Sequence, residues 1–314
     1  MAVPGLEAIT ATTYKHYNKQ FADNVSNHLP FLKYMTTKGK VELSGGDTIV
    51  EELMYAEGNG GSYSEADVMT VTKPEGLSAA EFNWKQVYAT VTYTGTDRLR
   101  NSGPERIQDL VKARIKQAEI TISNKVGTML FGDGTGNAGK DVLGLGAIVS
   151  TTPTTGVLGG INRANYSFWR NKVRTSAGSF ATNGLTYMGE MVRNTTRGMD
   201  KPNLIVTDAT VFNYLMQVAN GRAQFMNPSL ADQGFQALKY ENIDIIYDSQ
   251  CAAGRMYFLN TDYLKFKIHK DFNFKMGDFI EPADQDVKVA KILFSGQLTV
   301  SNCELQGVID GFTA

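Results

Sequence analysis

The chain of 314 residues has only two cysteines, Cys251 and Cys303, and three histidines, His16, His28 and His269. No pair of them has the spacing of a zinc or redox motif, so we expect neither a disulfide framework nor a bound metal or cofactor. The two cysteines are expected to be small buried apolar residues.

Long apolar segments and an excess of one charge are also missing. No apolar run approaches the roughly 18 residues of a membrane span, and no basic segment followed by an apolar core marks a secretory signal. The 31 basic residues balance 32 acidic ones, which gives no overall basic footprint for nucleic acid. The motifs G-x-S-x-G, H-E-x-x-H and C-x-x-C are absent as well. We therefore expect a protein without a membrane partner, made in a reducing cytoplasm, that is not an enzyme.

The strongest periodic pattern runs from Pro104 to about Leu130. Proline suits the first turn of a helix, because the amide that it lacks would have no partner there. The apolar residues recur at three- and four-residue spacing, which predicts a helix with one buried face. At about 1.5 Å per residue such a helix is roughly 40 Å long. It therefore needs an extended surface beneath it.

A glycine-rich segment follows this helix. Residues 134–140 fit both G-x-G-x-x-G and G-x-x-x-x-G-K, but a phosphate loop follows a strand and opens a helix. Here a helix leads into the glycines, and Asp141 takes the place of the hydroxyl that would bind magnesium. We therefore interpret Gly132, Gly134 and Gly136 as a structural hinge, a tight turn with left-handed glycines at a helix C-terminus. A phosphate-binding α/β enzyme that uses residues 131–141 is a remote alternative.

Residues 1–45 are interpreted as an N-terminal arm. Apolar residues at helical spacing give this arm one apolar face with little nearby sequence to cover it, before Pro30 interrupts the pattern. We expect this face to pack on another subunit, through Tyr14, Tyr17, Phe21, Val25 and Leu29.

Residues 47–97 are predicted to form a long β excursion. Strict alternation around residues 87–94 predicts one strand, and residues 47–55 are the matching outgoing strand. The polar stretch between them is long enough to be functional or disordered. The segment holds nine acidic and two basic residues, whereas residues 98–132 hold seven basic and three acidic ones. An acidic loop is thus followed directly by a basic helix.

The rest of the chain alternates between helix and strand and then becomes mostly β, so the fold class is α+β. In residues 147–250 we predict helices near Arg163–Arg174, Leu185–Arg197 and Asp208–Ala219, with strands at Leu204–Thr207 and Ile243–Tyr247. Residues 255–310 are predicted to be mostly β, with strands at Arg255–Asn260, Leu264–His269, Val287–Phe294 and Gln297–Glu304.

This order of segments carries a resemblance to a known family. A long helix runs into LFGDGTG (Leu130–Gly136) and then VLGLG (Val142–Gly146), and NLIVT (Asn203–Thr207) and RMYFLN (Arg255–Asn260) follow. The chain resembles the major capsid proteins of tailed bacteriophages, which have the Hong Kong 97-type shell fold. The resemblance covers essentially the whole chain.

The resemblance implies an N-arm (1–45), an extended β-hairpin called the E-loop (46–97), a peripheral domain (98–146 and 251–314) with a spine helix at about 104–130, and an α/β axial domain (147–250). It implies hexamers and pentamers that form an icosahedral virion shell around double-stranded DNA contacted non-specifically. The expected partners are other copies of the chain, a portal protein, and scaffold or decoration proteins. An encapsulin-type protein compartment is the alternative with the same fold.

In this family the E-loop lies over a neighbouring subunit, close to its spine helix. The charge segregation then predicts contacts from acidic E-loop residues of one subunit to basic residues of the next. The acidic residues are Glu51, Glu52, Glu57, Glu65 and Asp67, and the basic ones are Arg98, Arg106, Lys112, Arg114 and Lys116. Some members also form a Lys–Asn isopeptide between subunits. Lys73 is the sole lysine near the E-loop tip, and the alternative is that it is a solvated surface lysine.

Overall fold

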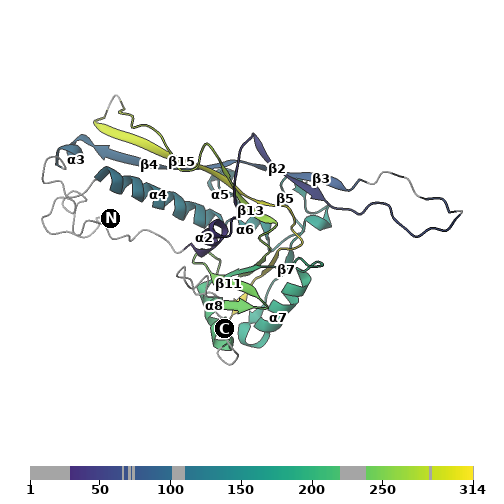
Figure 1. Cartoon of the computed structure of the whole chain (residues 1–314). Coiled ribbons are helices and arrows are strands. Elements are labelled where there is room, and N and C mark those ends of the chain that lie inside the picture. Colours follow the sequence, from purple (N-terminus) through teal and green to yellow (C-terminus); the bar gives the residue numbers. More distant parts are fainter. Residues whose placement is uncertain are drawn as a thin grey trace.

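The computed structural model describes residues 29–65, 67–69, 72, 75–100, 110–219, 238–282 and 285–313. Two main sheets carry the fold (Figure 1). One forms an elongated layer with a long helix along it, and the other lies below with its own helices. A two-stranded ribbon projects sideways from the elongated layer and ends in a long loop (Figure 1). No helix in the described part of the chain is long and apolar enough to cross a membrane.

The first sheet is built around one long strand, β15 (Val287–Val300). Two strands were predicted here, and that prediction is wrong, because the chain continues in one strand through residues 294–297. The strand changes partner without ending: β4 (Lys85–Thr94) pairs with its first part and β13 (Leu264–His269) with its last part. The shorter members of this sheet are β1 (Val41–Ser44) and β14 (Lys275–Met276).

Helix α4 (Leu110–Met129) lies along this sheet and packs against β4 (Figure 1). Its buried residues Ala118, Ile122 and Val126 share one core cluster with the buried face of β4. The predicted spine helix is confirmed from residue 110 onward. Residues 101–109 lie outside the described residues.

The second sheet has six strands, and two helices pack on it, α7 (Phe180–Asn194) and α8 (Ala209–Ala219). In spatial order the strands are β10 (Leu238–Tyr240), β11 (Ile243–Tyr247), β9 (Leu204–Thr207), β12 (Met256–Leu259), β16 (Gly307–Ile309) and β7 (Lys172–Arg174). A small pair, β8 (Gly178–Ser179) and β17 (Phe312–Thr313), lies apart from it.

Two expectations for this part differ from the structure. No helix spans residues 163–174, which hold a 3-10 turn at Ser167–Trp169 and then β7. The amide of Lys172 donates to the carbonyl of Gln306 at 2.9 Å, a pairing between distant parts of the chain that local spacing does not reveal. The boundary expected at residue 250 falls within this sheet's sequence, because β12 and β16 come after it. They are needed there, since β12 pairs with the edge of β9 that β11 leaves open.

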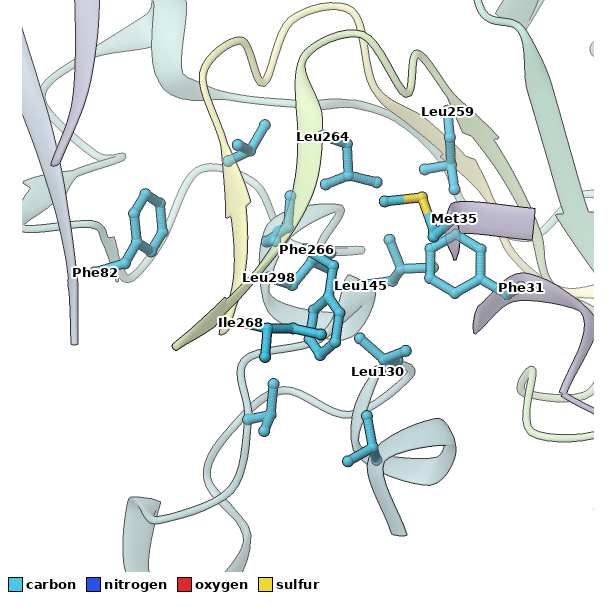
Figure 2. Close-up of a cluster of buried hydrophobic side chains, with 14 of the residues drawn as sticks. Phe31, Met35, Phe82, Leu130, Leu145, Leu259, Leu264, Phe266, Ile268 and Leu298 are labelled. Atoms are coloured by element: carbon cyan, nitrogen blue, oxygen red, sulfur yellow. The ribbon is translucent and has the colours of Figure 1, made fainter. Parts of the chain in front are cut away.

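Helix α2 (Pro30–Thr37) joins the core that links the two sheets. Its Phe31 and Met35 point into a cluster that contains Leu145, Leu264 and Leu259 (Figure 2). The N-terminus of α2 is fixed because the amide of Phe31 donates to Asp248 Oδ2 at 3.1 Å. The remaining short elements are α3 (Gly95–Arg100), α5 (Gly136–Gly139), α6 (Leu145–Ile148), β5 (Val157–Leu158) and β6 (Ile161–Asn162).

The glycine-rich turn closes the C-terminal end of α4. Of the three glycines interpreted as a hinge, only Gly134 has a left-handed backbone, with φ of +77°, and that expectation is wrong for Gly132 and Gly136. The amide of Leu145 donates to the carbonyl of Leu130 at 2.7 Å, and so helps to satisfy the free carbonyls at the helix end. This contact brings backbone against backbone at Gly144, where a Cβ would lie 2.3 Å from the Met129 carbonyl oxygen.

The close approach at Gly144 makes a stability prediction. Gly144→Ala should lower the free energy of unfolding by about 1–3 kcal/mol, because the overpacked atom is a backbone carbonyl that cannot rotate away. The matched control is Gly58→Ala, since a Cβ there meets no atom within 4 Å. Urea denaturation of the purified variants measures the difference, and equal midpoints for the two variants would contradict the proposed role of Gly144.

Candidate functional site

The projecting ribbon consists of β2 (Thr48–Met54) and β3 (Leu77–Asn83), which pair only with each other. The predicted outgoing strand is confirmed within one or two residues of its expected bounds, but its expected partner is wrong. Residues 87–94 lie in β4 and pair with β15, and the strand that returns beside β2 is β3, which was not predicted. Side chains alternate across the ribbon: Leu53 and Phe82 lie on a buried inner face, while Met54 and Leu77 of the outer face are 81% and 76% exposed. A two-stranded ribbon is marginal on its own, so contacts at its root decide where it points.

One root contact is an ion pair on the inner face. Glu51 Oε1 lies 2.6 Å from Lys267 Nζ of β13, with the side chains 14% and 13% exposed. The hydroxyl of Thr299 of β15 donates to the same carboxylate oxygen at 2.9 Å. Glu51 was predicted to contact another subunit, and that prediction is wrong, because its carboxylate faces its own sheet.

A second set of contacts holds the opposite side of the root. The rings of Tyr55 and Phe168 stack with centroids 4.9 Å apart. The amide of Glu81 donates to the carbonyl of Gly159 at 3.0 Å, so the loop between β5 and β6 covers the outer edge of β3 there. The direction of the ribbon is thus set within the subunit from two sides.

The tip beyond Tyr55 and Gly76 is exposed over its described residues. Among its described residues, Asn59 Nδ2 donates to Thr72 Oγ1 at 3.1 Å and so links the two sides of the loop. The acidic side chains expected to contact another subunit are exposed here: Glu52, Glu57, Glu65 and Asp67. Lys73, the candidate for a crosslink, lies outside the described residues.

Exposed apolar side chains accompany these acids, and they were not predicted from the sequence as contact residues. Val50, Met54 and Leu77 lie on the outer face of the ribbon, and Tyr63 and Val68 lie on the tip. The sequence signal for this surface is the presence of apolar residues at successive positions of β2. A strand with one face in water would instead alternate apolar and polar residues. Apolar side chains on a projecting ribbon are typical of a contact surface.

The second surface is a groove of about 700 Å³ between α4 and β4. Arg114 lines it, together with Lys125 and Lys140, against one acidic residue, Asp141. The predicted basic surface is therefore present on the described part of α4. Lys112 and Lys116 are exposed on the same helix. The side chain of Arg98 and all of Arg106 lie outside the described residues.

The N-arm expectations fall mainly on residues that are not described, Tyr14, Tyr17, Phe21 and Val25. Leu29 is described, and it packs within its own chain. A Cβ on Gly127 of α4 would lie 2.3 Å from Leu29 Cδ2, so the glycine makes the space that this leucine fills. Leu29 is half-buried, so this contact leaves part of its side chain exposed, and its packing in a shell stays a prediction.

The described residues form neither a phosphate loop nor a metal site. The glycine turn follows α4 and precedes no helix longer than four residues, so it does not present the helix N-terminus that a phosphate loop uses. No group of three or more metal-ligating side chains gathers among the residues described. Cys251 and Cys303 are both free and buried, as expected. Burial raises the pKa of the Cys303 thiol to about 12.

The chain is similar to known proteins in its fold. No protein-family model and no curated protein matches the sequence. Solved structures do match it. A chain of the capsid asymmetric unit of cyanophage A-1(L) is 18% identical, with 94% of this chain and 96% of that chain covered and a TM-score of 0.71.

Two further matches extend the comparison. The capsid of Myoviridae phage XM1 matches 98% of this chain and 100% of its own, at 12% identity and a TM-score of 0.60. The holo-SrpI encapsulin complex from Synechococcus elongatus matches 98% of this chain and 96% of its own, at 10% identity and a TM-score of 0.62. The chain has the Hong Kong 97-type shell fold.

The root ion pair makes a prediction about this fold's ribbon. Glu51→Gln should weaken the anchorage of β2 by about 1–2 kcal/mol, because it leaves the nearly buried Lys267 with only Glu42, at 3.9 Å. Amide hydrogen exchange in β2 and β3 should then be roughly tenfold faster.

The matched control is Glu52→Gln, which removes the same charge one residue away on the exposed face. Glu52 makes no ion pair with a described residue, so exchange in the ribbon should stay at the wild-type rate. Equal acceleration by the two variants would show that overall charge, and not the Glu51–Lys267 contact, fixes the ribbon.

Proposed function

We propose that this chain is a major capsid protein, which assembles into hexamers and pentamers of an icosahedral bacteriophage head around double-stranded DNA. The observation that carries the proposal is the projecting ribbon, because its exposed apolar outer face gains cover only when another molecule packs on it. The capsid fold, matched over nearly the whole chain, supports the same conclusion. The chain then acts by assembly and carries out no catalysis.

The finer parts of this proposal follow from the resemblance and the charges. Residues 1–45 act as the N-arm and 46–97 as the E-loop. Residues 98–146 and the parts of 251–314 outside β12 and β16 act as the peripheral domain, and 147–250 together with β12 and β16 act as the axial domain. A portal protein and scaffold or decoration proteins join the shell, and packaged DNA is contacted without sequence preference. The mature protein resides in the virion after synthesis in the bacterial cytoplasm.

An encapsulin-type compartment is the second function that this fold supports, since one matched structure is an encapsulin. The two functions differ in content: a phage head encloses DNA, and a compartment of this kind encloses protein. Electron microscopy of the purified protein should reveal closed shells. A separate assay should detect no nucleotide hydrolysis. Nuclease-protected DNA in particles from the native source then favours a phage head, whereas a protein cargo favours a compartment. A stable monomer at near-physiological salt would contradict both.

We further propose that the acidic E-loop of one subunit contacts the basic α4 of the next. Exposed ion pairs are each worth only about 0–1 kcal/mol, so their effect should lie in the rate and register of assembly. Lys112→Glu combined with Lys116→Glu should slow assembly, measured by light scattering. The slowing should shrink as salt is raised, because the screening length is about 10 Å at 0.1 M.

Compensating changes test the pairing. Adding Glu52→Lys and Glu57→Lys to the double variant should restore part of the rate, because both acidic side chains are exposed. Glu51→Lys should not restore it, since Glu51 is paired with Lys267 of its own chain. Rescue by Glu51→Lys and not by Glu52→Lys would refute this arrangement.

A further inference from the structure

One edge of β4 is free, because this strand of ten residues has a single partner among the described strands. The amide of Gly95 donates to the carbonyl of Asp286 at 3.1 Å, which continues the ladder between β4 and β15. Hydrogen-bonding direction alternates along an antiparallel strand. The amides of Gln86, Tyr88, Thr90 and Thr92 therefore point away from β15.

The next amide in this series confirms the alternation. Thr94 N–H is taken by the side chain of Asp97 at 3.2 Å, on the side away from β15. The four amides before it donate to no described residue. Unpaired amides in a row are the template on which another strand can add.

The groove beside this edge has the form of a strand site. Every residue from Gln86 to Thr92 lines it, as happens when a strand presents its edge, because a strand face presents only alternate residues. Seven residues span roughly 23 Å at 3.3 Å each. The opposite wall is a stripe of α4 with Arg114, Gln117, Thr121 and Lys125.

Among the described strands, the outer edge of β2 matches this groove. The amide of Tyr55 donates to Gly76 at 2.9 Å across the ribbon, so alternation turns the amides of Val50, Glu52 and Met54 outward. No described residue accepts from them. The outer edge of β3 is less available, because Glu81 N–H is bonded to Gly159.

We propose that β2 of a second copy adds to the free edge of β4 in this groove and forms a sheet between subunits. The proposal rests on the proposed function and specifies how the E-loop and α4 of two subunits join. Charge favours β2 as the occupant, since the groove has three basic residues and one acidic one. The described residues of β2 and β3 include acidic side chains and no basic one.

Proline scanning tests the pairing of amides. Thr90→Pro removes one outward amide and leaves the β4–β15 ladder intact, as proline on an edge strand can. We expect the yield of shells to fall at least tenfold, and Glu52→Pro to give the same loss from the β2 side.

The matched control is Val173→Pro in β7, the edge strand of the other sheet. Its neighbours bond to β16 and the following loop, so its own amide points outward, far from the groove in the fold. Shell yield should match the wild type. Normal shells from Thr90→Pro would overturn the strand pairing alone, whereas a wild-type protein that forms no shells would overturn the proposed function.

Disulfide trapping identifies the occupant even if a proline variant does not fold. Thr90→Cys and Glu52→Cys subunits are mixed, assembled and oxidised, and the linked peptides are identified by mass spectrometry. Cys251 and Cys303 are buried and should not react. A link between residues 52 and 90 of different copies is expected. A link from residue 90 to any other segment, to its own copy, or to none, in shells or in smaller oligomers, would overturn the proposal.

Discussion

The hydrogen-bond ladder of β15 positions both α4 and the root of the ribbon. One edge of the first half of this strand holds β4, and the second half holds β13 on the other side. Because β4 is held, α4 has a surface to cover and a groove forms along the outer edge of β4. Because β13 is held, Lys267 is presented to the root of the ribbon. A break in β15 would therefore disturb both surfaces that we assign to assembly.

The ribbon combines weak internal pairing with strong anchorage at one end. Its two strands have no other strand partner, but Glu51 faces Lys267 and Thr299 on one side, while Tyr55 stacks on Phe168 on the other. Glu51 is a nearly buried carboxylate between Ile49 and Leu53 on the inner face. It fixes one register, because a slip of two residues, which keeps the same face inward, would leave Lys267 opposite an apolar residue. The ribbon thus holds its exposed contact surface, far from the subunit body, in a defined direction.

The sequence predicts the elements whose signal is local. The spacing of apolar residues predicts α4, alternation predicts β4, and apolar runs predict β9 and β11. It also predicts that the E-loop is acidic and the spine helix basic, because the net charge of a segment follows from its residue types alone. The merged β15 and the strand β7 were not predicted, since each depends on a partner far away in the chain.

The order of the elements, the periodic faces of the helices and strands, and the separation of charge between the E-loop and α4 can therefore be read from the amino-acid sequence. Which acidic side chains remain available depends on the fold, because alternation along β2 turns Glu51 inward and Glu52 outward. The fold also explains why residue 144 is a glycine. A Cβ there would lie 2.3 Å from the carbonyl oxygen of Met129, at the end of α4. The free amides of β4 likewise follow from which edge β15 occupies, because hydrogen bonds between strands are fixed by pairing and not by residue type.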